Sequence, residues 1–419
     1  MRAEIKNRIE QIRQGKVPAG YKKTKQGISP AEWTGMSVKD CLCRVENPVQ
    51  VEPETLYTQI GIRSHGNGIF YKEPVTGCAL KNKSVFWIEP DCFILNIVFA
   101  WEQAVGRTTK AEKGMIGSHR FPMYRPIEDR VDIDYLVYYF LTPKGTNILE
   151  EASPGGAGRN RTLGQERFLK STILLPPIAE QQKIAKILMT QDRVIVLREK
   201  LLAEKLRRKQ YLTQILVTGK KRLPGFTEKW EKVKLNKLLH ERKIYSSKGN
   251  GYPHVTLGVE GIFPKTERYD REHLVKSADK EYKITRKGDI CYNPANLKFG
   301  VICENTYGDA IFSPIYVTFE VKPNICREFI ALYLMRWDFI HAVMKYEEGT
   351  VYERMAVKPD DFLKYEMYLP SYEEQKAIAH IFSLINQEID LLKQALEQEQ
   401  RKKKALMKLL LSGIVRVKP

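Results

Sequence analysis

The sequence predicts an α/β (α+β) protein in which two globular domains are joined by two long helices that pair as an antiparallel coiled coil. A repeat at an offset of 194 residues is the first observation: LLPPIAEQQKIAKIL from Leu174 aligns without a gap with YLPSYEEQKAIAHIF from Tyr368. In both copies apolar residues then recur at spacings of three, four and seven, with no interior glycine or proline, which favours one long helix per copy. A period of this length indicates a duplicated domain rather than a solenoid unit.

Each long helix needs a partner for its apolar stripe, which in the first copy comprises residues 184, 187, 188, 195, 202, 212, 215 and 216. About 40 residues at 1.5 Å per residue make a rod roughly 60 Å long. Gly219 and Gly413 supply the stops. The simplest partner is the other copy, running antiparallel, so that the pair holds two domains at a fixed distance. The alternative is that each helix folds back onto its own domain.

The repeat divides the chain into five segments: a short N-terminal helix (1–16), a first globular domain (17–170), a first long helix (171–221), a second globular domain (222–365) and a second long helix (366–419). In the short helix, Ile5, Ile9 and Ile12 lie at helical spacing and Gly15 is the stop. One interpretation packs this helix near the end of the C-terminal helix, which brings the chain ends together in a quasi-circular arrangement. The other is a frayed basic leader.

Each half is predicted to be an α/β domain that leads into its long helix. Runs such as SVFWIEP and AIFSPIYVTFEVKP end at Gly, Pro or Asn and are typical of strands and turns. A helix follows in both halves, where Tyr139 aligns with Tyr333, and both halves begin with a polar stretch that ends in a tryptophan, Trp33 or Trp230.

The charge of the chain favours a polyanionic partner. Lysine and arginine number 69 against 50 acidic residues, a formal net charge of +19, so nucleic acid is the first expectation and a basic membrane-surface protein the competing class. No apolar run approaches the length that spans a bilayer, so no membrane is expected. The seven cysteines form no C-x-x-C pair and no zinc-ligand spacing, which suits a reducing cytoplasm.

Three stretches of the first domain mix lysine, arginine, asparagine or histidine with glycine, the residue types that bind phosphates and base edges. They predict DNA contacts from Lys81, Asn82, Lys83, His119, Arg120, Arg125, Arg159, Asn160 and Arg161. In the last stretch, GGAGRNRT, successive glycines let backbone amides approach a phosphate while the arginines reach beyond it. The same stretch also fits a flexible joint between the domain and its helix.

The second domain offers fewer candidates for DNA contact: Tyr292, Asn293, Lys298 and Arg354. Arg354 lies in GTVYERM, which aligns with GGAGRNRT but has Glu353 where Arg159 stands, a departure that fits different base preferences. YNPAN at Tyr292 resembles part of a methyltransferase motif but lacks the second proline and the aromatic residue that would clamp a flipped base, so a turn after a strand is predicted.

Two basic clusters, residues 207–209 and 401–403, occupy identical register on the two helices. Cations near a helix C-terminus are favoured by the helix dipole and keep the outer face solvated. Contact with a partner subunit or with spacer DNA is the functional alternative.

No catalytic or metal site is predicted. The chain has no G-x-x-x-x-G-K-[ST] sequence to cradle nucleotide phosphates, and its seven histidines form no close metal-ligand pair.

The sequence resembles a known family, the specificity subunits of type I restriction-modification enzymes. The resemblance covers the whole chain and rests on LPPIAEQQKIAKIL and LPSYEEQKAIAHIF with their following helices, on TGKKRLPGFTEKWEKVKL, on KGDI at Lys287 and on SPGGAGRNRTLGQ at Ser153. It implies that each domain is a target recognition domain reading one part of a bipartite, asymmetric site in double-stranded DNA. It also implies that the helices set the spacing and dock two methyltransferase subunits, through which restriction subunits join.

The resemblance further implies that this chain catalyses nothing and holds no cofactor, with S-adenosylmethionine, ATP and Mg²⁺ on the partner subunits. Candidates for the docking surface are the repeated Glu-Gln pairs: Glu180, Gln181, Glu374 and Gln375. The two glutamates also fit first-turn acids favoured by the helix dipole.

Two other classes stay open from the sequence. A DNA methyltransferase or nuclease of unrecognised fold would show methyl transfer or cleavage when the chain is incubated with DNA, metal and S-adenosylmethionine. A coiled-coil adaptor that does not bind DNA would explain the helices and the duplication but not the charge, and an electrophoretic shift with duplex DNA discriminates it.

Overall fold

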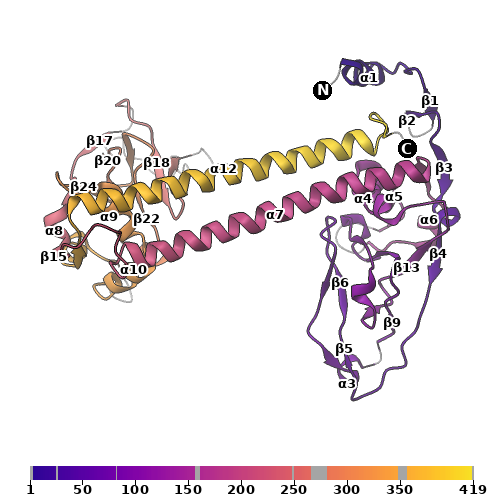
Figure 1. Ribbon diagram of the computed structural model, residues 1–419, viewed down its shortest axis with the longest axis horizontal. Coiled ribbons are helices and arrows are strands. Elements are labelled where there is room, and N and C mark those ends of the chain that lie inside the picture. Colours follow the sequence, from indigo (N-terminus) through magenta and orange to yellow (C-terminus); the bar gives the residue numbers. More distant parts are fainter. Residues whose placement is uncertain are drawn as a thin grey trace. The chain divides into compact units, whose positions relative to one another are not determined.

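The computed structural model describes residues 3–24, 27–81, 83–155, 161–247, 250–265, 281–347 and 356–417, and the chain forms two units (Figure 1). Unit 1 comprises residues 1–198 and 395–419, and unit 2 comprises residues 199–394. The division runs through both long helices, α7 (Ile178–Leu216) and α12 (Tyr372–Leu410), each of 39 residues. Each unit therefore contains one end of each long helix.

The other elements of unit 1 are, in chain order, α1 (Ala3–Arg13), β1 (Tyr21–Thr24), β2 (Gly27–Pro30), β3 (Thr34–Ser37), α2 (Val38–Cys41), β4 (Leu42–Val45), β5 (Leu56–Tyr57), β6 (Ile60–Ile62), β7 (Ile69–Tyr71), β8 (Val75–Thr76), α3 (Gly77–Leu80), β9 (Val85–Trp87), β10 (Phe93–Leu95), η1 (Ala100–Glu102), β11 (Val105–Arg107), η2 (Lys110–Glu112), β12 (Ile116–Ser118), β13 (Met123–Pro126), α4 (Ile133–Phe140), α5 (Pro143–Glu151), α6 (Gln165–Lys170) and β14 (Thr172–Leu175).

Those of unit 2 are β15 (Glu231–Lys234), α8 (Leu235–Leu238), β16 (Leu239–Glu241), β17 (Tyr245–Ser247), β18 (Val255–Gly258), β19 (Gly261–Pro264), β20 (Glu281–Thr285), β21 (Ile290–Tyr292), η5 (Leu297–Phe299), β22 (Ile302–Glu304), β23 (Ala310–Phe312), β24 (Val317–Val321), α9 (Arg327–Leu334), α10 (Trp337–Met344), α11 (Pro359–Phe362) and β25 (Glu366–Leu369).

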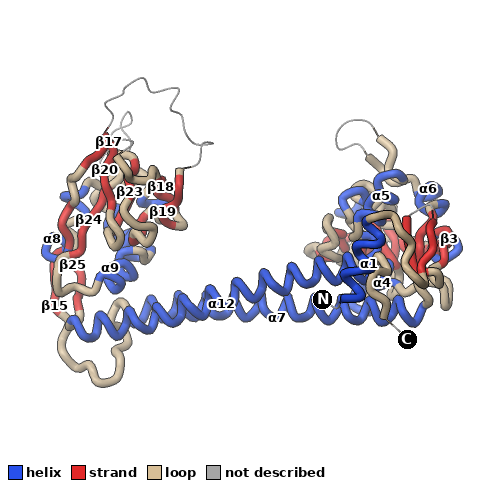
Figure 2. Tube along the Cα trace, turned by 90° about the horizontal axis from the view of Figure 1, so that it is seen from above, coloured by secondary structure: helices blue, strands red, loops and turns tan. Residues whose placement is uncertain are grey.

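The two units share one construction. Each has a four-stranded antiparallel sheet, in the order β11-β10-β13-β4 in unit 1 and β22-β21-β24-β16 in unit 2. At the offset of 194, α4, β14 and α7 coincide end to end with α9, β25 and α12, and α5 begins at the same position as α10 and is one residue longer. Figure 2 shows the strands of each unit gathered beside its end of the helix pair. The predicted duplication is thus confirmed in the positions of the elements themselves.

The long helices pair antiparallel, as predicted. In unit 1, Lys403 Nζ lies 2.5 Å from Asp192 Oδ1, and Arg198 lies 3.5 Å from Glu399 Oε1. Residues later in α7 thus pair with residues earlier in α12. In unit 2, Lys205 Nζ lies 2.6 Å from Glu388 Oε1. The alternative in which each helix folds back on its own domain therefore fails, because each unit holds both helices side by side.

The hydrophobic core of each unit is closed by both long helices. In unit 1, Ile184 and Leu188 near the start of α7 and Leu410 at the end of α12 are buried in one cluster with the domain. In unit 2, Leu216 at the end of α7 and Ile378 and Phe382 near the start of α12 are buried in the corresponding cluster. Fully burying one such side chain contributes about 1.5–3 kcal/mol, so each helix end is held firmly.

The N-terminal helix α1 packs near the end of the C-terminal helix, as one of the two sequence interpretations predicted. Arg8 Nη1 donates to the carbonyl of Ile414 over 2.7 Å, and the Tyr21 hydroxyl donates to the carbonyl of Gly413 over 2.6 Å. The Arg8 guanidinium also lies over the Tyr21 ring, 5.3 Å from its centroid. The beginning and the end of the chain therefore meet within unit 1.

Candidate nucleic-acid interface

A two-stranded ladder in unit 1 brings two of the predicted DNA-binding stretches together. Strands β9 and β12 run antiparallel with Val85 opposite Ser118, so the residues before β9 and the residues after β12 lie at the same end. The His119 amide donates to the Ser84 carbonyl over 3.2 Å and extends the ladder by one step. Lys83 and Arg120, both exposed, are therefore neighbours although they lie far apart in the sequence.

Strand β6 adds a cation that sequence reasoning missed. The Ile116 amide donates to the Thr58 carbonyl, and Gln59 and Ile116 form a parallel β-bridge. Strands β6 and β12 therefore run in the same direction and end on the same side. Arg63 directly follows β6, is exposed, and lies over the Phe70 ring at 4.8 Å. We name this group the basic edge: Arg63, Lys83, His119 and Arg120. Several cations at one sheet edge fit contact with a phosphate backbone.

Arg161 belongs to the same neighbourhood. The Ile97 amide donates to the Arg120 carbonyl, and the Leu163 amide donates to the Ile97 carbonyl, which links the basic edge to the segment that carries Arg161. The Arg161 guanidinium lies over the Trp101 ring, 5.5 Å from its centroid. A stacked arginine keeps its charge while its orientation is fixed.

The other first-domain candidates are placed differently. Lys81 is exposed in the turn before β9 with a positive φ of 53°. Arg125 lies on β13, in the four-stranded sheet, 3.7 Å from Glu89 Oε2, so its charge is partly countered within the chain. Asn82, Arg159 and Asn160 lie outside the described residues.

Two of the second-domain candidates were wrong. Tyr292 is completely buried, stacks on Phe319 and Phe362, and donates its hydroxyl to the Val357 carbonyl over 3.0 Å. Asn293 is 6% exposed, and its side-chain oxygen accepts from the Ala295 amide over 3.1 Å, which closes a turn. Both residues are therefore part of the domain's interior and present nothing to DNA.

Of the remaining second-domain candidates, Lys298 is exposed and Arg354 lies outside the described residues. The Lys298 ammonium lies 3.7 Å from Glu347 Oε1 and 5.7 Å from the centroid of the Phe299 ring. Lys298 is thus accessible, but a carboxylate of the same domain competes for it.

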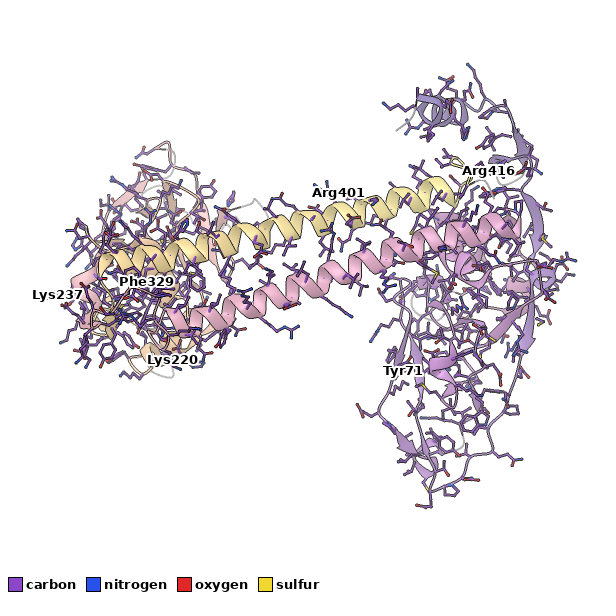
Figure 3. All side chains as sticks on the ribbon, viewed as in Figure 1. Tyr71, Lys220, Lys237, Phe329, Arg401 and Arg416 are labelled. Atoms are coloured by element: carbon purple, nitrogen blue, oxygen red, sulfur yellow. The ribbon has the colours of Figure 1, made fainter. Side chains whose placement is uncertain are left out.

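The four residues predicted to dock a partner subunit are buried instead, so that prediction was wrong. Glu180, Gln181, Glu374 and Gln375 are each at most 1% exposed. Figure 3 marks Arg416, which follows α12 and binds the first of them. Its Nε and Nη2 donate to the Glu180 carboxylate over 2.7 and 2.9 Å, and the Trp33 indole nitrogen donates to the same carboxylate over 3.3 Å.

Unit 2 repeats this arrangement with the ends of the helices exchanged. Arg222, which follows α7, donates to the Glu374 carboxylate at the start of α12 over 2.7 and 2.6 Å, and the Trp230 indole nitrogen donates over 2.9 Å. Hydrogen bonds to the carboxylates raise the pKa of both Arg222 and Arg416. We call each set a reciprocal clamp: Trp33, Glu180 and Arg416 in unit 1, and Trp230, Glu374 and Arg222 in unit 2.

The glutamine of each Glu-Gln pair holds the start of a neighbouring helix. Gln181 Oε1 accepts from the amide of Asp132, the residue that caps α4, and Gln375 Oε1 accepts from the amide of Cys326, the residue that caps α9. Each glutamine also donates to the carbonyl of the proline five residues earlier, over 2.9 Å in both cases. The repeated Glu-Gln motif is therefore an internal joint between the long helices and the domains.

The helices in the described ranges include none with an apolar stretch that could span a bilayer. The same ranges contain no group of three or more His, Cys, Asp or Glu side chains that could hold a metal ion.

The family model of the type I restriction modification DNA specificity domain matches residues 76–205 and 227–399, which is more than half of the chain. The chain belongs to this family. Its members are the non-catalytic DNA-recognition subunits of type I restriction-modification systems. The two matched ranges cover parts of the chain's two target recognition domains and of the long helices that follow them.

Two relatives come from Methanocaldococcus jannaschii. The specificity subunit is 25% identical over 324 residues to the putative type I restriction enzyme MjaX specificity subunit, with 71% of each chain covered. It is 22% identical over 421 residues to the type I restriction enzyme MjaVIII specificity subunit, with 93% of this chain and 94% of the relative covered.

Solved structures share the fold. The HsdS subunit of Thermoanaerobacter tengcongensis matches with a TM-score of 0.51 at 17% identity, covering 96% of this chain and 98% of that chain. The S subunit of M. genitalium matches with a TM-score of 0.52 at 13% identity, covering 90% and 96%. A chain from work on complex assembly and conformational transition of the type I R-M system matches with a TM-score of 0.56 at 16% identity, covering 92% and 99%.

Proposed function

We propose that this specificity subunit recognises a bipartite, asymmetric site in double-stranded DNA, with one part read by each domain. The observation that carries the proposal is the duplication: two units with equivalent elements but different exposed residues suit two different half-sites joined by an unread spacer. The basic edge and Arg161 supply phosphate and base-edge contacts in the first domain. Lys298 and the segment that contains Arg354 supply them in the second.

The same proposal includes partners. Two methyltransferase subunits dock on one copy of the chain, because the helix pair offers two related surfaces, and restriction subunits join through them. S-adenosylmethionine, ATP and Mg²⁺ are bound by those partners. The buried Glu-Gln pairs serve this assembly only indirectly, by fixing the helix ends on which exposed surfaces depend.

The basic edge gives a direct test of DNA contact. Replacing Lys83 and Arg120 with glutamine is expected to weaken duplex binding at low salt for all sequences. It should also flatten the dependence of log K on log salt by about 0.9 for each lost phosphate contact, hence by about 1.8 in total. Fluorescence anisotropy of a labelled duplex, titrated at several salt concentrations, measures both quantities.

A matched control lies at the opposite end of the same ladder. Lys110 and Lys113 are exposed and precede β12, and their replacement with glutamine removes the same net charge. Equal effects of the two double variants would mean that only overall charge matters and that the basic edge is not the contact. No binding by the unmodified subunit, with or without methyltransferase subunits, would favour the adaptor alternative.

A further inference from the structure

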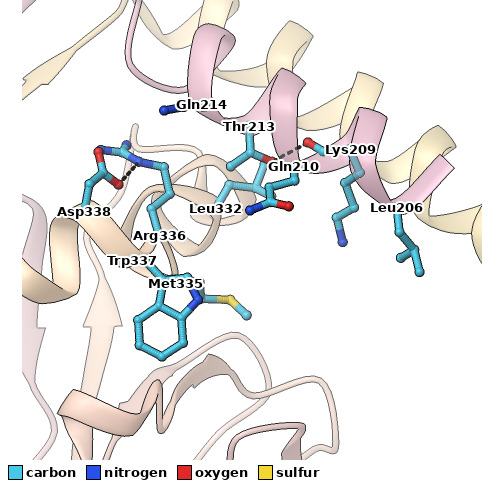
Figure 4. Close-up of a pocket in the computed structure, with 10 residues that line it drawn as sticks. All are labelled: Leu206, Lys209, Gln210, Thr213, Gln214, Leu332, Met335, Arg336, Trp337 and Asp338. Carbon is cyan, nitrogen blue, oxygen red and sulfur yellow. Dashed lines mark hydrogen bonds and ion pairs between the residues drawn. The ribbon is translucent and has the colours of Figure 1, made fainter. Parts of the chain in front are cut away.

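A groove of about 510 Å³ in unit 2 lies between the last turns of α7 and the corner where α9 leads into α10 (Figure 4). Leu206 and Lys209 line it from α7, and Leu332, Met335 and Trp337 line it from the α9–α10 corner. Leu206, Met335 and Trp337 are 44%, 47% and 54% exposed. Large apolar side chains gathered around a groove at this level of exposure indicate a surface that a partner covers.

The repeat supplies an internal comparison, because the counterparts of Leu332 and Lys209 in unit 1, Tyr138 and Lys403, belong to a set of side chains that contact one another. There the Tyr138 hydroxyl donates to Asp192 Oδ2 over 2.6 Å, and Lys403 Nζ lies 2.5 Å from Asp192 Oδ1. The Lys403 ammonium also lies 5.8 Å from the centroid of the Tyr138 ring. Burial and the hydrogen bond to Asp192 raise the pKa of Tyr138, as expected for a phenol held against a carboxylate. We call this set the plug: Tyr138, Asp192 and Lys403.

Unit 2 keeps the lysine of the plug and lacks its other two members. At the offset of 194, Lys209 corresponds to Lys403, but Leu332 stands for Tyr138 and Asn386 stands for Asp192. The phenol that would fill the space and the carboxylate that would pair the ammonium are both missing. Lys209 and Leu332, which both line the groove, therefore stand at two of the three plug positions.

Lys209 is left with an uncompensated charge. Among the described residues, Lys209 forms no ion pair. Asp390 is a nearby carboxylate but lies beyond ion-pair distance, and the positive charge of Lys393 repels the Lys209 ammonium. Asp338 is the one acid among the described residues that line the groove, and Arg336 donates two hydrogen bonds of 2.9 Å to its carboxylate. Burial, with a smaller contribution from Lys393, lowers the pKa of Lys209. A half-buried ammonium beside apolar side chains is stabilised when a carboxylate is brought to it.

We propose that this groove docks a segment of a methyltransferase subunit that packs an apolar side chain on Trp337 and Met335 and brings a carboxylate to Lys209. The inference rests on the proposed function and deepens it by making the two docking surfaces unequal. A protein fits better than DNA, because tryptophan, methionine and leucine around one cation match the core of a protein interface and offer a phosphate backbone little. The second half of the subunit thus carries a docking feature that the first half has closed.

The test transplants the plug into unit 2. The double substitution Leu332→Tyr with Asn386→Asp should fill the groove with a phenol and pair Lys209 internally, as in unit 1. Native mass spectrometry of the full-length chain with the purified methyltransferase subunit of its own system, over a range of concentrations, counts the bound copies. Two copies are expected on the unmodified chain, and the plugged variant should bind one of them about 10- to 100-fold more weakly.

A second variant keeps the test decisive if the plugged chain does not fold. Lys209→Gln with Trp337→Ala removes both contacts from the surface and should weaken the same copy, while Lys393→Gln, outside the groove lining, serves as the charge-matched control. Two copies bound to both groove variants with unchanged affinity would overturn the inference and leave the proposed function intact. No methyltransferase bound to the unmodified chain would overturn both.

Discussion

Replacing Arg222 with methionine is expected to lower the free energy of unfolding of unit 2 by about 3 kcal/mol, because the fully buried Glu374 carboxylate would lose its paired charge. Trp230 would remain as one hydrogen-bond donor, which is insufficient for a buried anion. The first turn of α12 and the stretch after α7 should then open together. Hydrogen exchange of the full-length chain, followed in residues 366–385, measures the loss as reduced protection.

The chain offers two controls for this prediction. Lys232 lies 2.7 Å from Glu366 on the surface of the same unit, and Lys232→Met should leave protection essentially unchanged because exposed ion pairs contribute little. Adding Glu374→Met to Arg222→Met should restore much of the loss, since an apolar pair replaces a buried ion pair at small cost. If Arg222→Met alone lost no more hydrogen-exchange protection than Lys232→Met, the clamp would not be what holds the helix ends.

Inserting seven residues into each long helix is expected to change the length of the spacer between the two half-sites and leave both half-sites unchanged. Leu197 and Leu391 stand at equivalent positions, and their side chains are 55% and 65% exposed. An insertion of seven residues after each therefore preserves the seven-residue repeat of the apolar stripe and does not interrupt the helices at a buried residue. Seven residues lengthen a helix by roughly 10 Å at 1.5 Å per residue. The preferred spacer should therefore grow by about three base pairs at 3.4 Å each.

Methylation mapping in cells that carry the doubly inserted subunit and its methyltransferase measures this spacing. Insertion into one helix alone is the control, because it shifts the two helices out of register and should abolish modification. Modification by the doubly inserted subunit at the original spacing would mean that the helices do not set the distance between the recognition domains.

The duplication and the helices could be predicted from the sequence because both depend on local periodicity. The stops at Gly219 and Gly413 follow the last residues of α7 and α12, and both adopt a positive φ that suits glycine, 72° and 73°. The antiparallel pairing followed from the narrow apolar stripe. The strands of each domain were predicted as runs but not as sheets, because their partners are distant in the sequence.

The site residues were harder to predict because side-chain burial decides their roles. The sequence predicts Glu180 and Glu374 as docking residues or as first-turn acids favoured by the helix dipole, and neither role requires burial. The signal that could have shown otherwise was present: Arg222 and Arg416 stand at the same offset of 194 as the glutamates, and each follows a helix end. Arg63 could not be predicted because β6 and β12 are distant in the sequence and lie side by side only in the folded domain.

The reciprocal clamps also constrain the order in which the chain can fold during synthesis. Unit 2 is continuous in sequence, whereas unit 1 needs residues 395–419 to close its core and its clamp. The loops closed by the two clamps span 152 and 236 residues, a difference in closure entropy of only about 0.4 kcal/mol, so equilibrium stability barely distinguishes them. The order of synthesis does distinguish the two clamps. At a synthesis rate of about 5–20 residues per second, Arg416 is added roughly 1–4 s after unit 2 is complete. The first recognition domain to be synthesised is thus the last to be closed, and until then its buried helix faces are open to chaperones.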